Sequence, residues 1–469
     1  YHQAAQYSDN DVWHWYNQGN VLALMGRYEE ALPLLERATE TNPRHARSWA
    51  RLGNALRQIK RYKEALGALE QATRLEPGYA WAWNEQGLTL EALGRFEEAL
   101  LSYQRASESA PSDPFYLYHQ ADILVTLNQY QGALELLERA LQIDGMNART
   151  WAKQGQVLRR LNRHADALRS YSRAVEVDPN YAWAWNGRGL ALSALGQHEE
   201  ALKAFVKATE LDRGDVWYWY NQGDELVLLN RHAQAVEVLE QGLRTNSTHI
   251  ESWAKLGQAL RRLNRHSDAL NAYDRALTLN PHYAWAWNGR GLALEALDRR
   301  EEAVASYERA IQEDSSIIWY YTNLVDLLLT LQRKPQALDV IDEATRVQPS
   351  NATAWARRGQ VLRRLGEYEQ AIQSYQRALE LDPKSGWAWN GQGLAHASLE
   401  QWSEALRCYQ QAVRYNPDDV WFWHNQGEAL LMIGQLAEAI AIFEQALQLD
   451  PQHEPTLRKL KQLRGDSRD

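Results

Sequence analysis

The amino-acid sequence predicts an all-α protein built from a short helical repeat, and three regularities support this fold class. Glycine recurs at positions 34 apart, from Gly19 to Gly427, with two interruptions. Alanine recurs at the same interval without any, from Ala31 to Ala439. Apolar and small residues between them follow the spacing of amphipathic helices. A fixed period of this length is typical of solenoids, in which each repeat buries its apolar face against its neighbours.

Each repeat is expected to contain two helices. In residues 46–79, the segment 49–60 (WARLGNALRQIK) is the first expected helix and 62–77 (YKEALGALEQATRLEP) is the second. The recurrent glycine and alanine are small because two antiparallel helices must approach closely there. Proline ends the second helix, as at Pro77, because it lacks the N–H that would continue the helix. Val325 replaces the glycine in one repeat and should push its two helices apart.

The organisation of the chain follows from the repeat. Residues 12–453 divide into thirteen repeats of equal length with no insertion. Residues 1–11 (YHQAAQYSDND) resemble 409–419 (YQQAVRYNPDD), so we expect the remnant of a preceding repeat and a chain that is part of a longer protein. Residues 454–469 carry Leu457, Leu460 and Leu463 on one side. This pattern predicts the polar-backed capping helix and tail that close the C-terminal end of a solenoid.

Composition narrows the possible functions. The 469 residues carry a net charge of −9, which disfavours general binding to nucleic acid. The single cysteine, Cys408, excludes an internal disulfide and fits a reducing compartment, so we expect a cytoplasmic protein. No segment of the sequence is long and apolar enough to suggest a membrane span.

The sequence lacks the motifs of the common catalytic and cofactor sites. It contains no G-x-x-x-x-G-K-[ST], no G-x-S-x-G and no H-E-x-x-H. Four histidines recur at the interval of the repeat and stand at a position that is aromatic in other repeats, so we interpret them as turn residues and not as metal ligands. They are His164, His198, His232 and His266. We therefore expect a protein without enzymatic activity, cofactor or metal.

The repeat resembles the tetratricopeptide repeat (TPR). In residues 46–79, Trp49, Gly53, Ala65 and Pro77 stand where this family has its W-x2-L-G-x2-Y, A-x3-F and proline signatures. The resemblance covers residues 12–453. It implies a right-handed superhelix of antiparallel helix pairs, in which the first helix of each pair lines a concave groove and the second lies outside.

Many repeats carry tryptophan at both the second and the fourth position, counted from the first residue of the repeat, as in YAWAWNGRGLAL (181–192). Residues two apart on a helix point about 200° apart, so both tryptophans cannot enter the same core. In the TPR family the fourth position is the core aromatic. The second position shares a stripe with positions 5, 9, 12 and 13, which faces the groove in that family. Alternatively, these tryptophans only cover the neighbouring first helix.

The stripe varies with a longer period of three repeats, which is the interval from Trp183 to Trp285. The first kind of repeat carries aromatic residues and usually an acid, the second is basic, and the third carries tryptophan, asparagine and leucine. The longer period concentrates in the stripe, which favours a selected binding role. Recent duplication is the alternative, because the segments 151–168 and 253–270 differ at only three positions.

The stripe residues are the predicted partner-binding residues. By kind of repeat they are Trp217, Tyr220, Asp224 and Trp319; Arg57, Lys153, Arg159, Arg160, Lys255, Arg261, Arg262, Arg363 and Arg364; and Trp81, Asn84, Trp183, Asn186, Trp285, Asn288, Trp387 and Asn390. Arginine presents a fixed fork of donors to carboxylates, and tryptophan offers a large apolar area. Asparagine in such grooves commonly grips extended peptides in the TPR family.

We therefore expect a scaffold that binds a protein or peptide with acidic and apolar residues. The array resembles the C-terminal sensor or docking arms of bacterial signalling ATPases, which is an analogy at the level of the fold. The alternative is binding of single-stranded nucleic acid on the ladder of tryptophan and arginine. Acidic residues on the same stripe, such as Asp122 and Asp326, disfavour that alternative.

Overall fold

The predicted all-α solenoid is confirmed. The computed structural model describes residues 11–465 and contains only helices, turns and links in that range. The predicted remnant of a preceding repeat, residues 1–11, lies outside the described residues except for Asp11, and so do residues 466–469 of the tail. The helices divide into two units, which are taken one at a time below: an N-terminal unit that ends at Asn246 and a C-terminal unit that begins at Ser247.

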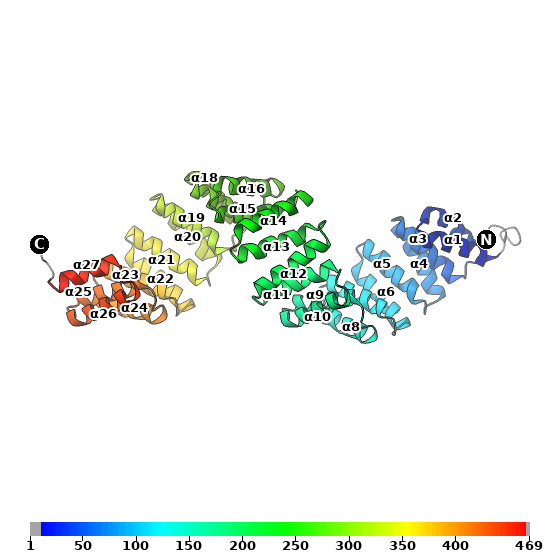
Figure 1. Cartoon of the computed structure of the whole chain (residues 1–469), viewed down its shortest axis with the longest axis horizontal. Coiled ribbons are helices and arrows are strands. Elements are labelled where there is room, and N and C mark those ends of the chain that lie inside the picture. Colours follow the sequence, from blue (N-terminus) through cyan, green and yellow to red (C-terminus); the bar gives the residue numbers. More distant parts are fainter. Residues whose placement is uncertain (1–10, 466–469) are drawn as a thin grey trace. The chain divides into compact units, whose positions relative to one another are not determined.

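The N-terminal unit consists of seven helix pairs (Figure 1). We call the odd-numbered member of each pair the first helix and the even-numbered member the second helix. The helices are α1 (Val12–Leu24), α2 (Tyr28–Thr41), α3 (Ala46–Gln58), α4 (Tyr62–Leu75), α5 (Ala80–Ala92), α6 (Phe96–Ser109), α7 (Pro114–Thr126), α8 (Tyr130–Ile143), α9 (Ala148–Arg160), α10 (His164–Val177), α11 (Ala182–Ala194), α12 (His198–Leu211), α13 (Val216–Leu228) and α14 (His232–Thr245).

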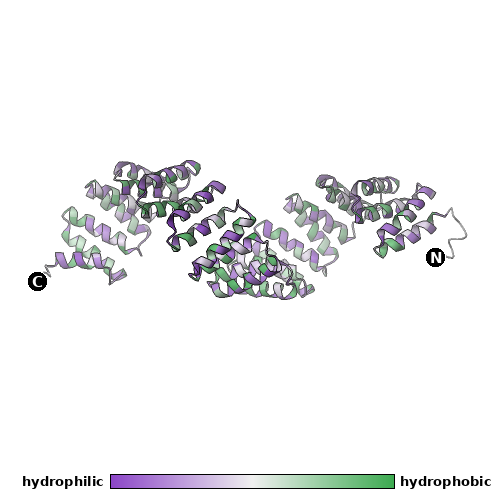
Figure 2. Cartoon of the chain, turned by 90° about the horizontal axis from the view of Figure 1, so that it is seen from above, coloured by the Kyte–Doolittle hydropathy of each residue, from purple (hydrophilic) through white to green (hydrophobic). Residues whose placement is uncertain are grey.

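The C-terminal unit consists of six helix pairs and one further helix. They are α15 (Ile250–Arg262), α16 (His266–Leu279), α17 (Ala284–Ala296), α18 (Arg300–Glu313), α19 (Ile318–Thr330), α20 (Lys334–Val347), α21 (Ala352–Leu365), α22 (Tyr368–Leu381), α23 (Gly386–Ser398), α24 (Trp402–Tyr415), α25 (Val420–Met432), α26 (Leu436–Leu449) and α27 (Glu454–Leu463). Hydrophobic and hydrophilic residues alternate along the helices, as amphipathic segments require (Figure 2).

The glycine that most first helices carry fixes how closely the two helices of a pair approach. A Cβ atom on Gly53 would lie 2.5 Å from the Leu69 Cγ atom of the second helix. The same substitution at Gly189 would place a Cβ atom 2.5 Å from the Phe205 ring. Val325 stands at this position in α19, where it is fully buried, and α19 and α20 contact each other less closely than the two helices of the other pairs do.

The fourth-position tryptophan fastens the link that precedes its helix. Its indole Nε1 donates a hydrogen bond to the backbone carbonyl six residues earlier. The distances are 2.9 Å from Trp49 to Pro43 and 2.9 Å from Trp151 to Gly145. The same bond recurs at Trp83, Trp185, Trp219, Trp253, Trp287, Trp355, Trp389 and Trp423. In these pairs the indole therefore sets the angle at which the new helix pair begins.

Helix α27 packs on the last helix pair. Leu460 is buried against Leu430 and Phe443, and Leu463 is half-buried beside them. The Thr456 hydroxyl is fully buried and lies 2.9 Å from Nδ1 of His424 and 2.7 Å from Nδ1 of His453. This placement supports the capping role that we propose for residues 454–469. No helix in residues 11–465 has the length and apolar character needed to cross a membrane.

We predict opposite effects for two glycine substitutions in one helix pair. Gly53→Ala forces a Cβ atom against Leu69 and should lower stability by about 1–3 kcal/mol. Gly67→Ala, on the exposed face of α4, meets nothing within 4 Å and should raise stability by up to about 1 kcal/mol, because alanine favours the helix. Thermal unfolding followed by circular dichroism measures both. Equal effects of the two substitutions would contradict the close-contact role of Gly53.

We also predict that acid loosens α27. Burial lowers the pKa of His424; Glu428 opposes this change, whereas His453 and Lys459 reinforce it. The folded state disfavours the imidazolium form of His424. The stability that the neutral side chain contributes is therefore fully present above the ordinary pKa of 6.5 and is lost as the pH falls below it. The fall in melting temperature between pH 7.5 and 5.5 should therefore be smaller in His424→Gln than in the native chain. His45 and His119, whose pKa values burial also lowers, contribute equally to both proteins. An identical fall in the two proteins would exclude His424 as the cause.

Candidate functional site

The first helices present the predicted stripe on one face of each unit, which we call the first-helix face. In the N-terminal unit α3 contacts α5 and α9 contacts α11, and in the C-terminal unit α15 contacts α17 and α21 contacts α23. Successive first helices therefore lie closer together than successive second helices do. An array of this kind curves toward the side where its helices are closest. The first-helix face is thus the inner side of each unit.

One group of predicted tryptophans is covered by a cation from the preceding first helix. The Arg51 guanidinium lies 4.4 Å from the centroid of the Trp81 ring, and the Lys153 ammonium lies 5.8 Å from that of Trp183. In the C-terminal unit Lys255 lies 5.2 Å from Trp285 and Arg357 lies 5.3 Å from Trp387. Such contacts contribute about 0.5–2 kcal/mol each, depending on desolvation. These tryptophans hold successive first helices together.

Two of the covering cations also pair with an acid on the first helix before them. Lys153 Nζ lies 2.7 Å from Asp122 Oδ1, and Arg357 Nη1 lies 3.1 Å from Asp326 Oδ1. Acid, cation and tryptophan thus come from three consecutive first helices, for example α7, α9 and α11. We call this arrangement the acid–cation–tryptophan chain. It gives the period of three repeats a structural role, in addition to any role in binding.

Three of the four predicted asparagines join the third kind of repeat to the next repeat of the first kind. Oδ1 of Asn186 accepts a 2.8 Å hydrogen bond from Nδ2 of Asn221. The same bond joins Asn288 to Asn323 and Asn390 to Asn425, each at 2.8 Å. Asn84 is 1 % exposed. The structure therefore places the side-chain oxygens of three of these asparagines between helices, and the sequence signal for this was a second asparagine at a constant interval.

A second group of aromatic side chains on the first-helix face is about half exposed. Trp217 is 48 % exposed and lies beside Tyr220 in α13, with ring centroids 5.7 Å apart; Asp224 is on the same helix. Trp319 is 58 % exposed. The group as a whole is Trp13, Phe115, Trp217, Trp319 and Trp421, all at the second position of the first kind of repeat. Only two of the five were among the predicted partner-binding residues.

The predicted arginines occupy three different environments. Arg160, Arg262 and Arg364 are exposed at or near the C-terminal ends of α9, α15 and α21. Their neighbours Arg159, Arg261 and Arg363 are half-buried, and each lies beside the hydroxyl of a tyrosine on the following second helix. The tyrosines are Tyr171, Tyr273 and Tyr375. Arg57 differs, because it forms a 2.9 Å ion pair with Glu85.

A cavity of about 240 Å³ opens next to one exposed aromatic side chain. It is lined by Phe115 and Tyr118 of α7 and by Asn147 and Arg149 at the start of α9. Burial raises the pKa of Tyr118 to about 12, so its hydroxyl is protonated and neutral. Arg149 is exposed and brings a positive charge to the rim. The cavity can accept an apolar side chain with an anionic group next to it.

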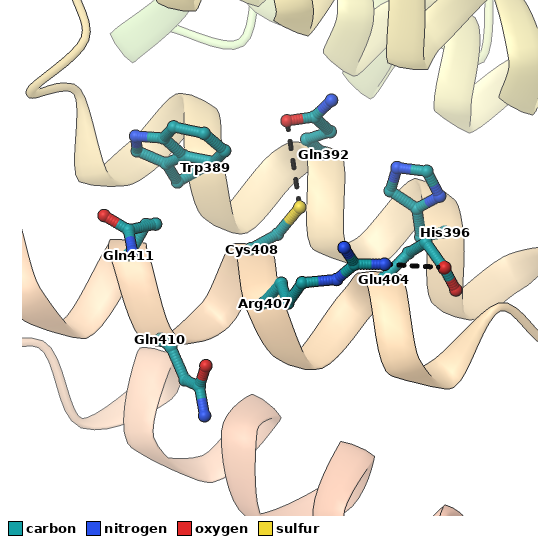
Figure 3. A pocket seen from close by; sticks show the side chains of 8 residues that line it. All are labelled: Trp389, Gln392, His396, Glu404, Arg407, Cys408, Gln410 and Gln411. Carbon is teal, nitrogen blue, oxygen red and sulfur yellow. Dashed lines mark hydrogen bonds and ion pairs between the residues drawn. The ribbon is translucent and has the colours of Figure 1, made fainter.

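A larger cavity, of about 540 Å³, lies between α23 and α24 (Figure 3). It contains the single cysteine, Cys408, whose thiol donates a 3.8 Å hydrogen bond to Oε1 of Gln392. Burial raises the pKa of Cys408 to about 11, which keeps the sulfur protonated and a poor nucleophile at neutral pH. In residues 11–465, no group of three or more His, Cys, Asp or Glu side chains is placed to hold a metal ion.

Family profiles identify the repeat. Profiles described as tetratricopeptide repeat match residues 16–80, 54–114, 84–148, 254–316, 322–386 and 390–454. Further TPR profiles match residues 155–196, 182–215 and 218–249. No curated protein sequence matches the chain.

Solved structures resemble this chain at low similarity. YrrB, a TPR protein with an unusual peptide-binding site, is 22 % identical over 40 % of this chain and 96 % of its own, with a TM-score of 0.35. Yeast Tom70 is 16 % identical over 90 % and 96 %, with a TM-score of 0.44. Cut9–Hcn1 of the APC/C is 14 % identical over 98 % and 97 %, with a TM-score of 0.41.

The acid–cation–tryptophan chain predicts different costs for two basic residues of α9. Lys153→Met removes the ion pair to Asp122 and the contact with Trp183, and should destabilise the N-terminal unit by about 1–2 kcal/mol. Arg160→Met, at an exposed position, should change stability by less than about 0.5 kcal/mol. Urea unfolding of the two variants tests the assignment. If Lys153→Met unfolds at the same urea concentration as Arg160→Met, the acid–cation–tryptophan chain does not stabilise the fold.

Proposed function

Because the chain belongs to the tetratricopeptide repeat family, whose members are typically scaffolds for protein interaction, we propose that it is a non-catalytic scaffold that binds a protein or peptide on the first-helix face. The proposal goes beyond family membership in naming the surface and the chemistry of the partner. The aromatic group defined above carries the proposal. Large aromatic side chains that stay about half exposed at a regular interval are suitable anchors for a partner, because aromatic residues carry much of the binding energy at protein interfaces.

The contrast between the two tryptophan groups supports this choice of surface. Trp81 and Trp183 have a cation over the ring and serve the contact between helices. Trp319, by contrast, keeps 58 % of its surface exposed. Burying such a ring against a partner removes a large apolar area from water at little cost in side-chain entropy. We therefore assign the main apolar contacts to the exposed group.

Acidic and apolar residues are the partner chemistry that we favour. The cavity at Phe115 offers aromatic walls with Arg149 at the rim, which suits an apolar side chain beside a carboxylate. Arg160 in the N-terminal unit adds an exposed guanidinium group at the end of α9, and Arg262 and Arg364 do so for the first helices α15 and α21 of the C-terminal unit. Guanidinium groups bind carboxylates through paired, charge-assisted hydrogen bonds. An extended peptide could use both kinds of contact at once.

Single-stranded nucleic acid is a weaker candidate. Lys153 and Arg357 form ion pairs with Asp122 and Asp326. They also cover tryptophan rings that would otherwise be free to stack on bases. Acidic side chains on the first helices, such as Asp224, would repel a phosphate backbone. Within the proposed function, we place the array as the C-terminal sensor or docking arm of a larger protein, by analogy with TPR arms of bacterial signalling ATPases.

Peptides selected from a random display library against this chain test the proposal. We expect selected peptides rich in acidic and apolar residues. Trp319→Ala and Phe115→Ala together should weaken their binding at least tenfold, since each substitution removes a half-exposed aromatic contact. Leu101→Ala, at an apolar position of the second helix α6 that is 62 % exposed, is the matched control and should bind normally.

Two results would contradict the proposal. One is selected peptides that bind both variants equally. The other is a preference for oligonucleotides over peptides, with an affinity that falls steeply and linearly with salt on logarithmic axes, as release of counterions from phosphates requires.

A further inference from the structure

The first basic repeat contains a carboxylate site that is filled by the protein itself. Oε2 of Glu85, on α5, accepts hydrogen bonds from Arg57 Nε at 3.0 Å and from Asn54 Nδ2 at 2.8 Å, both on α3. Arg57 Nη2 lies 2.9 Å from the same oxygen. Glu85 is 5 % exposed. An arginine at position 12 and an amide at position 9 of a first helix therefore form a working receptor for a carboxylate.

The other three basic repeats keep this receptor but lack the internal carboxylate. The amide and the arginine recur as Gln156 and Arg159, Gln258 and Arg261, and Gln360 and Arg363. Glycine replaces Glu85 at the corresponding positions, which are Gly187, Gly289 and Gly391. Tyrosine replaces Leu69, and its ring occupies the space beside the glycine. A Cβ atom on Gly187 would lie 2.2 Å from the Tyr171 ring. In all three repeats, therefore, tyrosine replaces the leucine and glycine replaces the glutamate.

This exchange leaves three guanidinium groups without a negative partner. Burial raises the pKa of Tyr171 to about 12, although the neighbouring Arg159 lowers it, so the phenol is neutral at physiological pH. Tyr273 is affected in the same way, with Arg261 beside it. The tyrosine hydroxyl supplies an oxygen to the arginine, but it supplies no charge.

Unpaired buried atoms at these positions point to an external ligand. Nε of Arg159, Arg261 and Arg363 is buried and has no hydrogen-bond partner among the described residues. Oε1 of Gln156 and of Gln258 is also buried and unpaired within the described chain. A buried polar atom without a partner costs about 1–3 kcal/mol. Arg51 and Arg188 also have an unpaired Nε, but their guanidinium groups lie 4.4 and 5.3 Å from tryptophan rings, which explains their positions.

We propose that Arg159, Arg261 and Arg363 bind carboxylate side chains of a peptide partner, and that Glu85 occupies the corresponding site of the first basic repeat as an internal substitute. The proposal rests on the proposed peptide-binding function and specifies where its acidic residues go. The arginine takes the carboxylate, as Arg57 takes Glu85. The unpaired oxygens of Gln156 and Gln258, which cannot bond a carboxylate, accept a backbone N–H of the same peptide. Oε1 of Gln360 instead already accepts a 2.9 Å hydrogen bond from Arg357 Nη1. Arg160, Arg262 and Arg364 add a second cation next to each site.

The test closes the three sites by giving each the leucine and glutamate that the first basic repeat has as Leu69 and Glu85. The closed variant carries Tyr171→Leu, Gly187→Glu, Tyr273→Leu, Gly289→Glu, Tyr375→Leu and Gly391→Glu. A charge-matched control carries Gln142→Glu, Ser267→Glu and Gln376→Glu at exposed positions of α8, α16 and α22. The probe is a fluorescein-labelled peptide of alternating glutamate and leucine. Its glutamine–leucine counterpart is the neutral probe, and binding is followed by fluorescence anisotropy.

We expect the native chain and the charge-matched control to bind the glutamate probe at least tenfold more tightly than the neutral probe. The closed variant should bind both probes equally weakly. The reverse exchange, Leu69→Tyr with Glu85→Gly, should open the site that Glu85 fills in the first basic repeat. It should therefore increase the amount of glutamate probe bound at saturation. Circular dichroism checks that each variant is folded. Arg159→Gln, Arg261→Gln and Arg363→Gln, which add no bulk, replace the closed variant if it unfolds.

The proposal is overturned if the native chain does not distinguish the two probes, or if the closed variant binds the glutamate probe as well as the charge-matched control does. Either result leaves the broader function open to its own test. Library-selected peptides that still lose affinity on substitution of Trp319 and Phe115 would show a peptide-binding face whose acidic contacts lie elsewhere.

Discussion

The close contact between a first-helix glycine and a large side chain on its second helix is the constraint on which the fold depends. Gly53 meets Leu69, Gly87 meets Tyr103 and Gly189 meets Phe205, always at the same separation in the sequence. Once two helices touch there, the fourth-position indole reaches the carbonyl of the preceding link. The second-position side chain is then turned to the opposite side, onto the first-helix face. The proposed binding surface is therefore a consequence of how closely the helices of each pair pack.

The sequence period predicted the helices well, and the misses have local causes. For residues 46–79 the expected helices were 49–60 and 62–77, and the observed ones are Ala46–Gln58 and Tyr62–Leu75. The start of the first helix was predicted too late because His45 gives no strong N-cap signal in the sequence. The second ends two residues before Pro77 because proline disfavours helical backbone in the residue before it. The boundary between the two units, at Asn246 and Ser247, has no counterpart in the sequence, since the period continues through it.

The candidate site was predicted as a surface, but its internal pairing was not. A stripe position alone cannot show that Trp183 is covered by Lys153 whereas Trp319 is half exposed. The information was present as spacing, because an acid, a cation and a tryptophan recur at the same relative positions in both units. Such spacings acquire meaning only when the distance between successive first helices is known. Residues that look alike in the repeat alignment therefore divide into contacts within the scaffold and groups that remain accessible.

The three kinds of first-helix interface differ in their polar links. Asp122 and Lys153 join the first kind of repeat to the second, Lys153 and Trp183 join the second to the third, and Asn186 and Asn221 join the third to the next first. Nearly identical repeats can align out of order while they fold, which is a known hazard of repeat proteins. A repeat paired with the wrong neighbour here would bury an aspartate against a tryptophan or an asparagine against a lysine. The links thus label the order of the repeats, so that a chain of almost interchangeable parts has one favoured assembly.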